Sequence, residues 1–177
     1  MAISTSSGPP GLALRCDAGQ IRAWVAHGER GTADRLAQEV AQLAAELDIG
    51  VGDLRDFVVV VGPGSFTGVR AGVALAQGML LGASGDAAVR AYPIGQLEAI
   101  AYTAAQHRTH RFETGLVVID DARRGRAFLQ VFDRAGKRRA EPSLLDVAAV
   151  AEFVATFHGC ALMAPSLKAQ PDIADAC

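Results

Sequence analysis

Residues 57–70 read FVVVVGPGSFTGVR, and this stretch decides the fold. The apolar run from Phe57 to Val61 is typical of a strand buried on both faces. The strand leads directly into a glycine-rich turn, after which a helix is expected over residues 69–81. Because α/β sheets place ligands at the carboxyl ends of their strands, this turn is the first candidate site. The stretch therefore predicts an α/β protein.

The turn matches none of three enzymatic templates. It lacks the lysine of a phosphate-binding P-loop, the glycine spacing of a dinucleotide loop and the G-x-S-x-G of a nucleophile elbow. A strand, glycine turn and helix can still hold phosphate, because backbone N–H groups and the helix dipole point to one spot. The alternative is that the glycines only permit a tight turn and close packing, with Ser65 or Thr67 capping the helix. The candidate phosphate contacts are Gly62, Gly64, Ser65, Thr67 and Gly68.

The helix after the turn carries two series of small residues at four-residue spacing. One series is Ala74, Gly78 and Gly82, and the other is Gly68, Gly72 and Ala76. Small residues at this spacing allow another backbone to approach closely. The helix is therefore a candidate docking surface, either for a neighbour in the same fold or for another chain.

The bulk composition excludes several classes of protein. With 177 residues and 50% hydrophobic composition the chain can bury a core, and a net charge of −2 gives no domain-wide footprint of a nucleic-acid binder. Three distant cysteines suggest neither a disulfide framework nor a zinc site, so a reducing compartment is expected. We expect no secretory signal, and the apolar run over residues 71–83 is too short to span a bilayer.

The length of the chain suits one large domain or two small ones, and for two domains the division is expected between residues 1–106 and 107–177. Two hairpins are expected, and a polar connector is expected near residues 106–111. The clearest amphipathic helix is expected over residues 32–48, with Leu36, Val40, Leu43 and Leu47 on one face. The other expected elements are an edge strand at residues 2–5, hairpin strands at 12–16 and 21–26, a strand at 88–92, a helix at 94–106, hairpin strands at 116–119 and 127–132, a helix at 146–157 and a strand at 160–163.

The stretch GPGSFTGVRAGVALAQGMLLG, residues 62–82, resembles the signature of the bacterial TsaB (YeaZ) family, an accessory subunit of the machinery that makes threonylcarbamoyladenosine in tRNA. Three other stretches agree in order and spacing. AISTSS at residues 2–7 resembles the family's opening AIDTST strand, AYPIGQLEAIA at 91–101 its GVSTLEALA helix entry, and DARRGRAF at 121–128 its DARRGEVY hairpin.

This resemblance implies an actin-like, hexokinase-like (ASKHA) fold of two related α/β domains. It also implies a cytoplasmic protein that is not an enzyme by itself, although many relatives carry a glycoprotease-like label. The implied partners are a TsaD-like catalytic subunit and a TsaE-like ATPase, and a homodimer is implied in their absence. The resemblance implies no contact with a membrane, and it implies that tRNA contacts the chain only indirectly. No cofactor of its own is implied, and ATP or ADP is expected at the interface with the catalytic partner. The implied interface comprises Leu36, Val40, Leu43, Arg70, Gly72, Ala74, Leu75, Gly78 and Met79.

The sequence also departs from the family pattern. Ser4 stands where the first strand usually has Asp, a position used for phosphate and metal chemistry in the wider superfamily, and this argues against independent ATP hydrolysis. His107 and His110 are three residues apart, whereas the catalytic relative binds its metal with an H-x-x-x-H pair. The chain ends at Cys177, before a typical member does, so the second domain is expected to be incomplete.

Two alternatives to the accessory role remain open at this stage. One is an ASKHA-type phosphotransferase or ATPase that uses the glycine turn for phosphate, and the other is an inactive divergent remnant. A further basic run, Arg123, Arg124 and Arg126 with residues 137–139 close behind, is either a solvated hairpin end or a patch that meets tRNA or a nucleotide phosphate.

Overall fold

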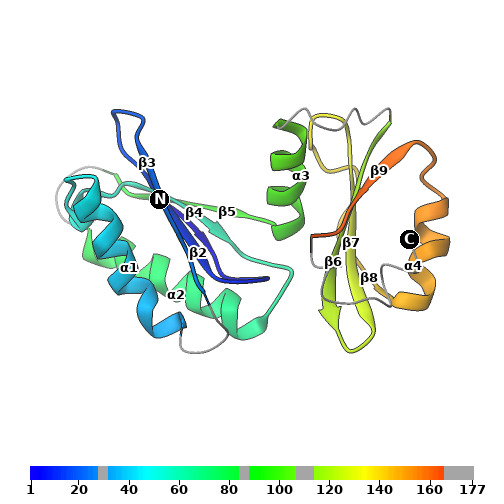
Figure 1. Ribbon diagram of the computed structural model, residues 1–177, viewed down its shortest axis with the longest axis horizontal. Coiled ribbons are helices and arrows are strands. Elements are labelled where there is room, and N and C mark those ends of the chain that lie inside the picture. The colour runs from blue at the N-terminus through cyan, green and yellow to red at the C-terminus, as the bar shows by residue number, and fades with distance from the viewer. Residues whose placement is uncertain (28–31, 84–87, 107–113, 166–177) are drawn as a thin grey trace. The chain divides into compact units, whose positions relative to one another are not determined.

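The computed structural model describes residues 1–27, 32–83, 88–106 and 114–165, and it divides the chain into two compact units, Met1–Gly95 and Gln96–Cys177. Each unit is built on one β-sheet (Figure 1). The first unit contains β1 (Ala2–Ser4), β2 (Gly11–Arg15), β3 (Ile21–Val25), α1 (Thr32–Glu46), a 3-10 turn (Val51–Asp53), β4 (Asp56–Val60), α2 (Phe66–Gly82) and β5 (Arg90–Ile94).

The sheet of the first unit has the strand order β3-β2-β1-β4-β5. The predicted first hairpin is confirmed, because β2 and β3 pair antiparallel. The strand β4 pairs parallel with both β1 and β5. The prediction that residues 2–5 form an edge strand is wrong, because β1 pairs with β2 on one side and with β4 on the other. The first strand of the chain therefore lies in the middle of its sheet.

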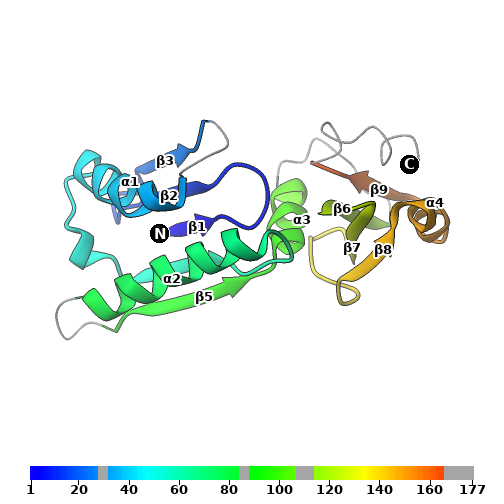
Figure 2. The ribbon, with the colours of Figure 1, turned by 90° about the horizontal axis from the view of Figure 1, so that it is seen from below.

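Both helices of the first unit cover the same face of this sheet. Leu36 and Val40 of α1 and Ala76 of α2 belong to one buried cluster with Ile3 and Phe57 of the strands. Figure 2 shows α1 and α2 from a second direction. The prediction that the run from Phe57 to Val61 is buried on both faces is wrong at two positions, because Val58 is 38% exposed and Val61 is 44% exposed. Val58 points away from the face that the helices cover, as the alternation of a strand requires, and Val61 follows the end of β4.

The second unit contains α3 (Gln96–Gln106), β6 (Gly115–Arg123), β7 (Arg126–Phe132), β8 (Ser143–Asp146), α4 (Val147–Ala155) and β9 (Cys160–Met163). Its sheet has the order β8-β7-β6-β9, in which β6 and β9 run parallel. The predicted β6–β7 hairpin is confirmed, and β8 is an additional strand that the sequence did not predict.

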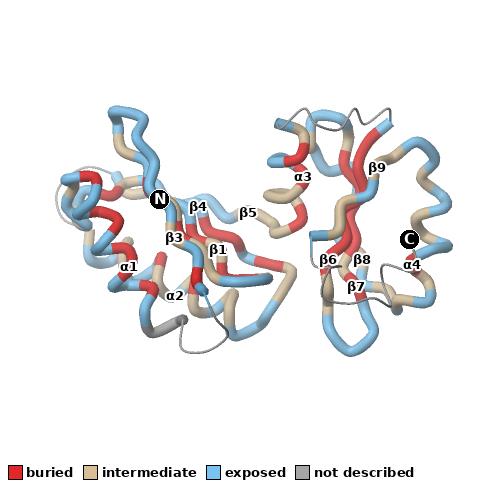
Figure 3. The backbone as a smooth tube through the Cα atoms, in the orientation of Figure 1, coloured by how far each residue is buried: buried red, intermediate tan, exposed pale blue. Residues whose placement is uncertain are grey.

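The two helices of the second unit cover opposite faces of its sheet. Leu97 and Ala101 of α3 pack with Leu116 and Val118 of β6, while α4 packs against the other face, which carries Val117. Figure 3 shows the buried residues concentrated on β6 and β7 between the two helices. The core of this unit is therefore a helix–sheet–helix sandwich.

The division between the units differs from the predicted boundary. The structure divides the chain after Gly95, whereas the sequence placed the boundary after residue 106 and assigned the helix before it to the first domain. The helix α3 belongs to the second unit because Leu97 and Ala101 have no exposed surface and lie in the core of that unit. The predicted connector lies mostly outside the described residues, as do His107 and His110.

Candidate functional site

The glycine turn lies at the carboxyl end of β4, where it was predicted, and it is closed by contacts with the end of β1. The Gly62–Pro63 peptide bond is cis, and Gly62 and Gly64 have φ values of +107° and +155°. The backbone N–H of Ser65 donates a hydrogen bond of 2.6 Å to the carbonyl oxygen of Ser6. The turn is thereby fastened to the segment that follows β1.

The helix α2 begins at Phe66, because Ser65 caps it. The Ser65 hydroxyl oxygen accepts a hydrogen bond of 3.2 Å from the backbone N–H of Gly68, which satisfies one of the open donors of the first turn. Of the two predicted caps, Ser65 is therefore the one that the structure uses, and Thr67 is exposed on the first turn.

Three glycines let the end of β1 approach α2 closely. A Cβ atom at Gly64 would collide with the carbonyl oxygen of Ser6, and one at Gly68 would collide with that of Thr5. A Cβ atom at Gly72 would meet the Thr5 hydroxyl oxygen, which donates a hydrogen bond of 2.7 Å to the Gly68 carbonyl oxygen. The series Gly64, Gly68 and Gly72 thus faces the interior of the first unit.

The opposite side of α2 is open. We call Phe66, Arg70, Ala74, Gln77, Gly78 and Leu81 the outer face of α2; at 3.6 residues per turn these positions form one stripe along the helix, and all are exposed. The side chains of Phe66 and Leu81 are among the most exposed large apolar groups, at 76% and 89%. The Arg70 guanidinium lies 5.2 Å from the centroid of the Phe66 ring. A Cβ atom added at Gly78 would meet nothing within 4 Å.

The structure therefore separates the predicted interface residues into two groups. Leu36, Val40, Leu43 and Gly72 are buried within the first unit, so their side chains already have neighbours in the same chain. Leu75 and Met79 are partly buried against the same core. Arg70, Ala74 and Gly78 lie together on the outer face of α2. Sequence reasoning missed Phe66 and Leu81, whose positions on the same helical stripe were the available signal.

The strand end next to the turn carries hydroxyl groups rather than a carboxylate. Ser4 ends β1, and the two following residues, Thr5 and Ser6, are buried. The Thr5 hydroxyl donates a hydrogen bond to the Gly68 carbonyl oxygen, and the Ser6 carbonyl oxygen accepts one from the backbone N–H of Ser65. These polar groups consequently hold the turn and the helix together.

Comparison with known proteins shows the family to which this chain belongs. The family model described as "TsaD: tRNA N6-adenosine threonylcarbamoyltransferase" matches residues 27–164, which include the turn and α2. The chain belongs to the TsaD family. The predicted resemblance to TsaB (YeaZ) is confirmed as well: this TsaD-family chain is 33% identical over 132 residues to the "tRNA threonylcarbamoyladenosine biosynthesis protein TsaB" of Bacillus subtilis (strain 168).

That match covers 75% of this TsaD-family chain and 54% of TsaB, so the chain spans about half the length of its curated relative. "YeaZ from Pseudomonas aeruginosa" superposes with a TM-score of 0.67 at 21% identity, covering 82% of this chain and 65% of YeaZ. A second structure, described as "an uncharacterized protein with similarity to peptidase YEAZ from Pseudomonas aeruginosa", gives 0.70 at 21% identity, with coverage of 83% and 66%. These two structures confirm the expected actin-like (ASKHA) α/β fold.

Within the described ranges of this TsaD-family chain, no helix is long and apolar enough to cross a membrane.

Proposed function

We propose that this chain is a non-catalytic subunit in the synthesis of threonylcarbamoyladenosine in tRNA, and that it supports a related TsaD-like catalytic subunit. The proposal follows the description of its relative TsaB as a threonylcarbamoyladenosine biosynthesis protein. The observation that carries it is the outer face of α2, where Phe66 and Leu81 expose large apolar groups at the two ends of a stripe whose middle is formed by Ala74 and Gly78.

The outer face has the composition of a contact surface for another helix. Exposed apolar groups gain about 25 cal/mol for each Å² that a partner covers. Ala74 and Gly78 leave room between them for the partner's backbone, and Arg70 supplies a guanidinium for a carboxylate at the rim. We propose the same face for a homodimer when the catalytic partner is absent, and a TsaE-like ATPase as a further member of this cytoplasmic assembly.

The turn supports an accessory role better than independent catalysis. Ser4 offers no carboxylate at the strand end, and Thr5, Ser6, Ser65 and Gly68 are joined to one another by hydrogen bonds within the chain. A residual phosphate contact through Thr67 and the first turn of α2 fits an ATP or ADP held mainly by the catalytic partner. We therefore expect calorimetry to detect no ATP binding by the chain alone; micromolar binding with magnesium and turnover would instead favour the ATPase alternative.

Capture of the TsaD-like protein from the same genome tests the docking face. Replacement of Gly78 with Trp should lower the captured amount at least tenfold, because the indole ring would stand where the partner's backbone approaches. Gly78→Ala should retain capture, since it adds one methyl group in open space. The matched control is Ala151→Trp, which places the same ring at an exposed alanine of α4.

Two outcomes of this experiment would overturn parts of the proposal. Unchanged capture by a folded Gly78→Trp variant would exclude the outer face of α2 as the interface. Failure of the unmodified chain both to capture the partner and to restore growth of a strain that lacks its accessory subunit would favour an inactive remnant. Gly72 is unsuitable for this test because its Cβ position is occupied by the Thr5 hydroxyl, so a large side chain there would disrupt the unit itself.

A further inference from the structure

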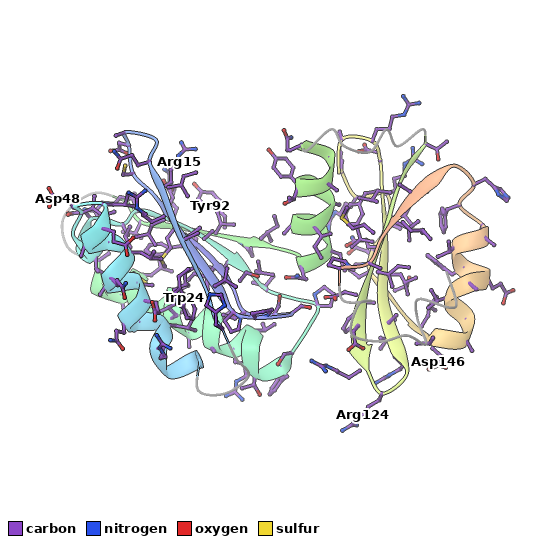
Figure 4. The ribbon with its side chains drawn as sticks, in the orientation of Figure 1. Arg15, Trp24, Asp48, Tyr92, Arg124 and Asp146 are labelled. Carbon is purple, nitrogen blue, oxygen red and sulfur yellow. The ribbon has the colours of Figure 1, made fainter. Side chains whose placement is uncertain are left out.

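The β6–β7 hairpin of the second unit ends in a tip that presents three arginines. The tip comprises Arg123, Arg124, Gly125 and Arg126, all of them exposed. Figure 4 shows the Arg124 side chain extending from the end of the hairpin, away from the sheet. None of these side chains contributes to the two hydrophobic clusters of the unit. Their removal would therefore leave the core intact.

The backbone of the tip adopts a conformation that does not favour arginine. Arg123, Arg124 and Gly125 have φ values of +66°, +57° and +72°. Arg124 and Gly125 form a two-residue hairpin turn with both central residues at positive φ, where Asn or Gly is normally preferred. A left-handed conformation costs a residue with a Cβ atom about 1 kcal/mol relative to Gly. Two consecutive arginines at such positions indicate a use other than stability.

The tip is held in place from both sides. The Asp121 carboxylate accepts a hydrogen bond of 2.7 Å from the backbone N–H of Arg123, and its other oxygen lies 3.5 Å from the Arg123 Nε. The backbone N–H of Val147, the first residue of α4, donates a hydrogen bond of 2.9 Å to the Gly125 carbonyl oxygen. The arginines are thus displayed on a fixed turn rather than on a loose loop.

The other basic residues of this unit are used differently. The sequence suggested one patch that combined the tip with residues 137–139, but β7 separates them and places the second group at its other end. There, Arg138 pairs with Glu98 and Glu141. In the part of the chain that the structure describes, no ion pair joins Arg124 to a carboxylate. Arg126 lies opposite Asp146 in strand register without an ion pair between them.

We propose that this tip binds phosphate groups of an RNA backbone, and that the RNA is the tRNA of the proposed function, on which this inference rests. A guanidinium matches the geometry of a phosphate with two parallel hydrogen bonds, and phosphate contacts position a protein on RNA without reading its sequence. Of the three arginines only Arg123 has an ion pair among the described residues, with Asp121, so two guanidinium groups remain for phosphate. This contact is direct, in contrast to the expectation that tRNA meets the chain only through its partner.

Replacement of Arg124 with Asn tests the proposal with two readouts of opposite sign. Asn tolerates positive φ and carries no charge, so the free energy of unfolding should rise while affinity for RNA falls. With labelled tRNA and the full chain in 50 mM salt, fluorescence anisotropy should show binding that is weakened about fivefold by Arg124→Asn. The slope of log K against log salt should fall by about 0.7 to 0.9 for each phosphate that the variant no longer neutralises, and by about twice that for the double variant Arg124→Asn/Arg126→Gln.

The matched control is Arg134→Asn, which removes one exposed arginine at the other end of β7. Equal weakening by Arg134→Asn and Arg124→Asn would overturn the proposal, because it would show diffuse attraction only. No binding of tRNA by the unmodified chain in 50 mM salt would overturn it too, as would tight binding of ATP or of an acidic peptide at Arg124 without tRNA binding.

Capture of the TsaD-like partner is measured in parallel with the same variants. If the variants still capture the TsaD-like partner and replacement of the tip arginines does not change RNA binding, this inference alone is overturned. Failure of the unmodified chain to capture the partner overturns the proposed function.

Discussion

The hydroxyl of Thr5 donates a hydrogen bond of 2.7 Å to the carbonyl oxygen of Gly68, and this bond joins the end of the central strand β1 to the first turn of α2. The same hydroxyl oxygen occupies the place of a side chain at Gly72. The Thr5 carbonyl oxygen occupies the corresponding place at Gly68, so two oxygens of one residue require glycines at two successive turns of the helix. These contacts explain why the inner side of α2 has Gly68 and Gly72. Gly78 on the outer face has no such contact, so its small size has a different cause.

Replacement of Gly72 and Gly78 with Ala should have opposite effects on stability. Gly72→Ala should lower the free energy of unfolding by about 1 to 3 kcal/mol, because the added methyl group overpacks against Thr5. Gly78→Ala should raise it by about 0.5 to 1 kcal/mol, because Ala restricts the unfolded chain in an exposed helix interior where nothing obstructs it. Urea unfolding of the two variants measures both values. Equal effects would show that the two faces of α2 have been assigned incorrectly.

Replacement of Asp120 with Asn should stabilise the second unit. Asp120 is 2% exposed; its Oδ1 accepts a hydrogen bond of 3.0 Å from the backbone N–H of Asp121, whereas its Oδ2 has no partner among the described residues. Burial of a charged oxygen without a partner is unfavourable, so loss of the charge should raise the free energy of unfolding by about 1 kcal/mol. Thermal unfolding of the variant provides the measurement. A lower stability would indicate a buried water at Oδ2.

Replacement of Leu97 with Ala should destabilise the second unit rather than the first. Leu97 has no exposed surface and packs in the core formed by α3 and β6, so its truncation should cost about 2 to 5 kcal/mol. Hydrogen exchange should then accelerate at residues 116–118 and remain unchanged in β4 and β5. Faster exchange in β4 and β5 instead would return α3 to the first domain, as the sequence had predicted.

Acid should weaken the turn between β7 and β8 through Asp133. Its carboxylate oxygen accepts hydrogen bonds of 2.9 Å from the backbone N–H groups of Lys137 and Ala135. The bond from Lys137 is the main cause that lowers the pKa of Asp133 below 3.8, with Arg139 adding to the effect. A depressed pKa means that the carboxylate contributes stability above pH 3.8, and that this contribution is lost as the pH falls through the folded-state value.

Asp133→Ala should therefore destabilise the protein at pH 7 and have a smaller effect near pH 3. Urea unfolding of both proteins at the two pH values measures the difference. A difference that grows on acidification would contradict the assigned direction of the pKa shift.

Strands with a strong local pattern could be predicted from the sequence, but their neighbours could not. The apolar run of β4 and the hairpin pattern of β2 and β3 are local properties, and the structure confirms these strands. The position of β1 depends on its pairing with β4, which lies more than 50 residues further along the chain, so a short polar-flanked strand was placed wrongly at the edge. The strand β8 was missed because its four residues have no pattern beyond their pairing with β7.

The candidate site was predicted in position but not in orientation. The turn and its helix lie where the sequence placed them, yet helical spacing alone did not tell which small residues face inwards. Gly72 and Gly78 have the same chemistry, and they are distinguished only by the contact of Gly72 with Thr5. The assignment of α3 to the wrong unit has a similar cause, because an apolar helical stripe does not identify the sheet that covers it.

The central place of β1 also has a consequence for synthesis on the ribosome. The strand emerges before the other strands of its sheet, and β2 and β3 can pair with it within a short stretch of chain. Its other edge has to wait for Asp56–Val60, so for several seconds of translation the nascent protein carries a three-stranded meander with an open edge. The glycines of α2 then fasten the helix to the segment after β1, when Gly68 and Gly72 reach Thr5, and β5 completes the sheet last by pairing with β4. Co-translational folding of this unit should consequently show one cooperative step once the residues of α2 and β5 have left the exit tunnel.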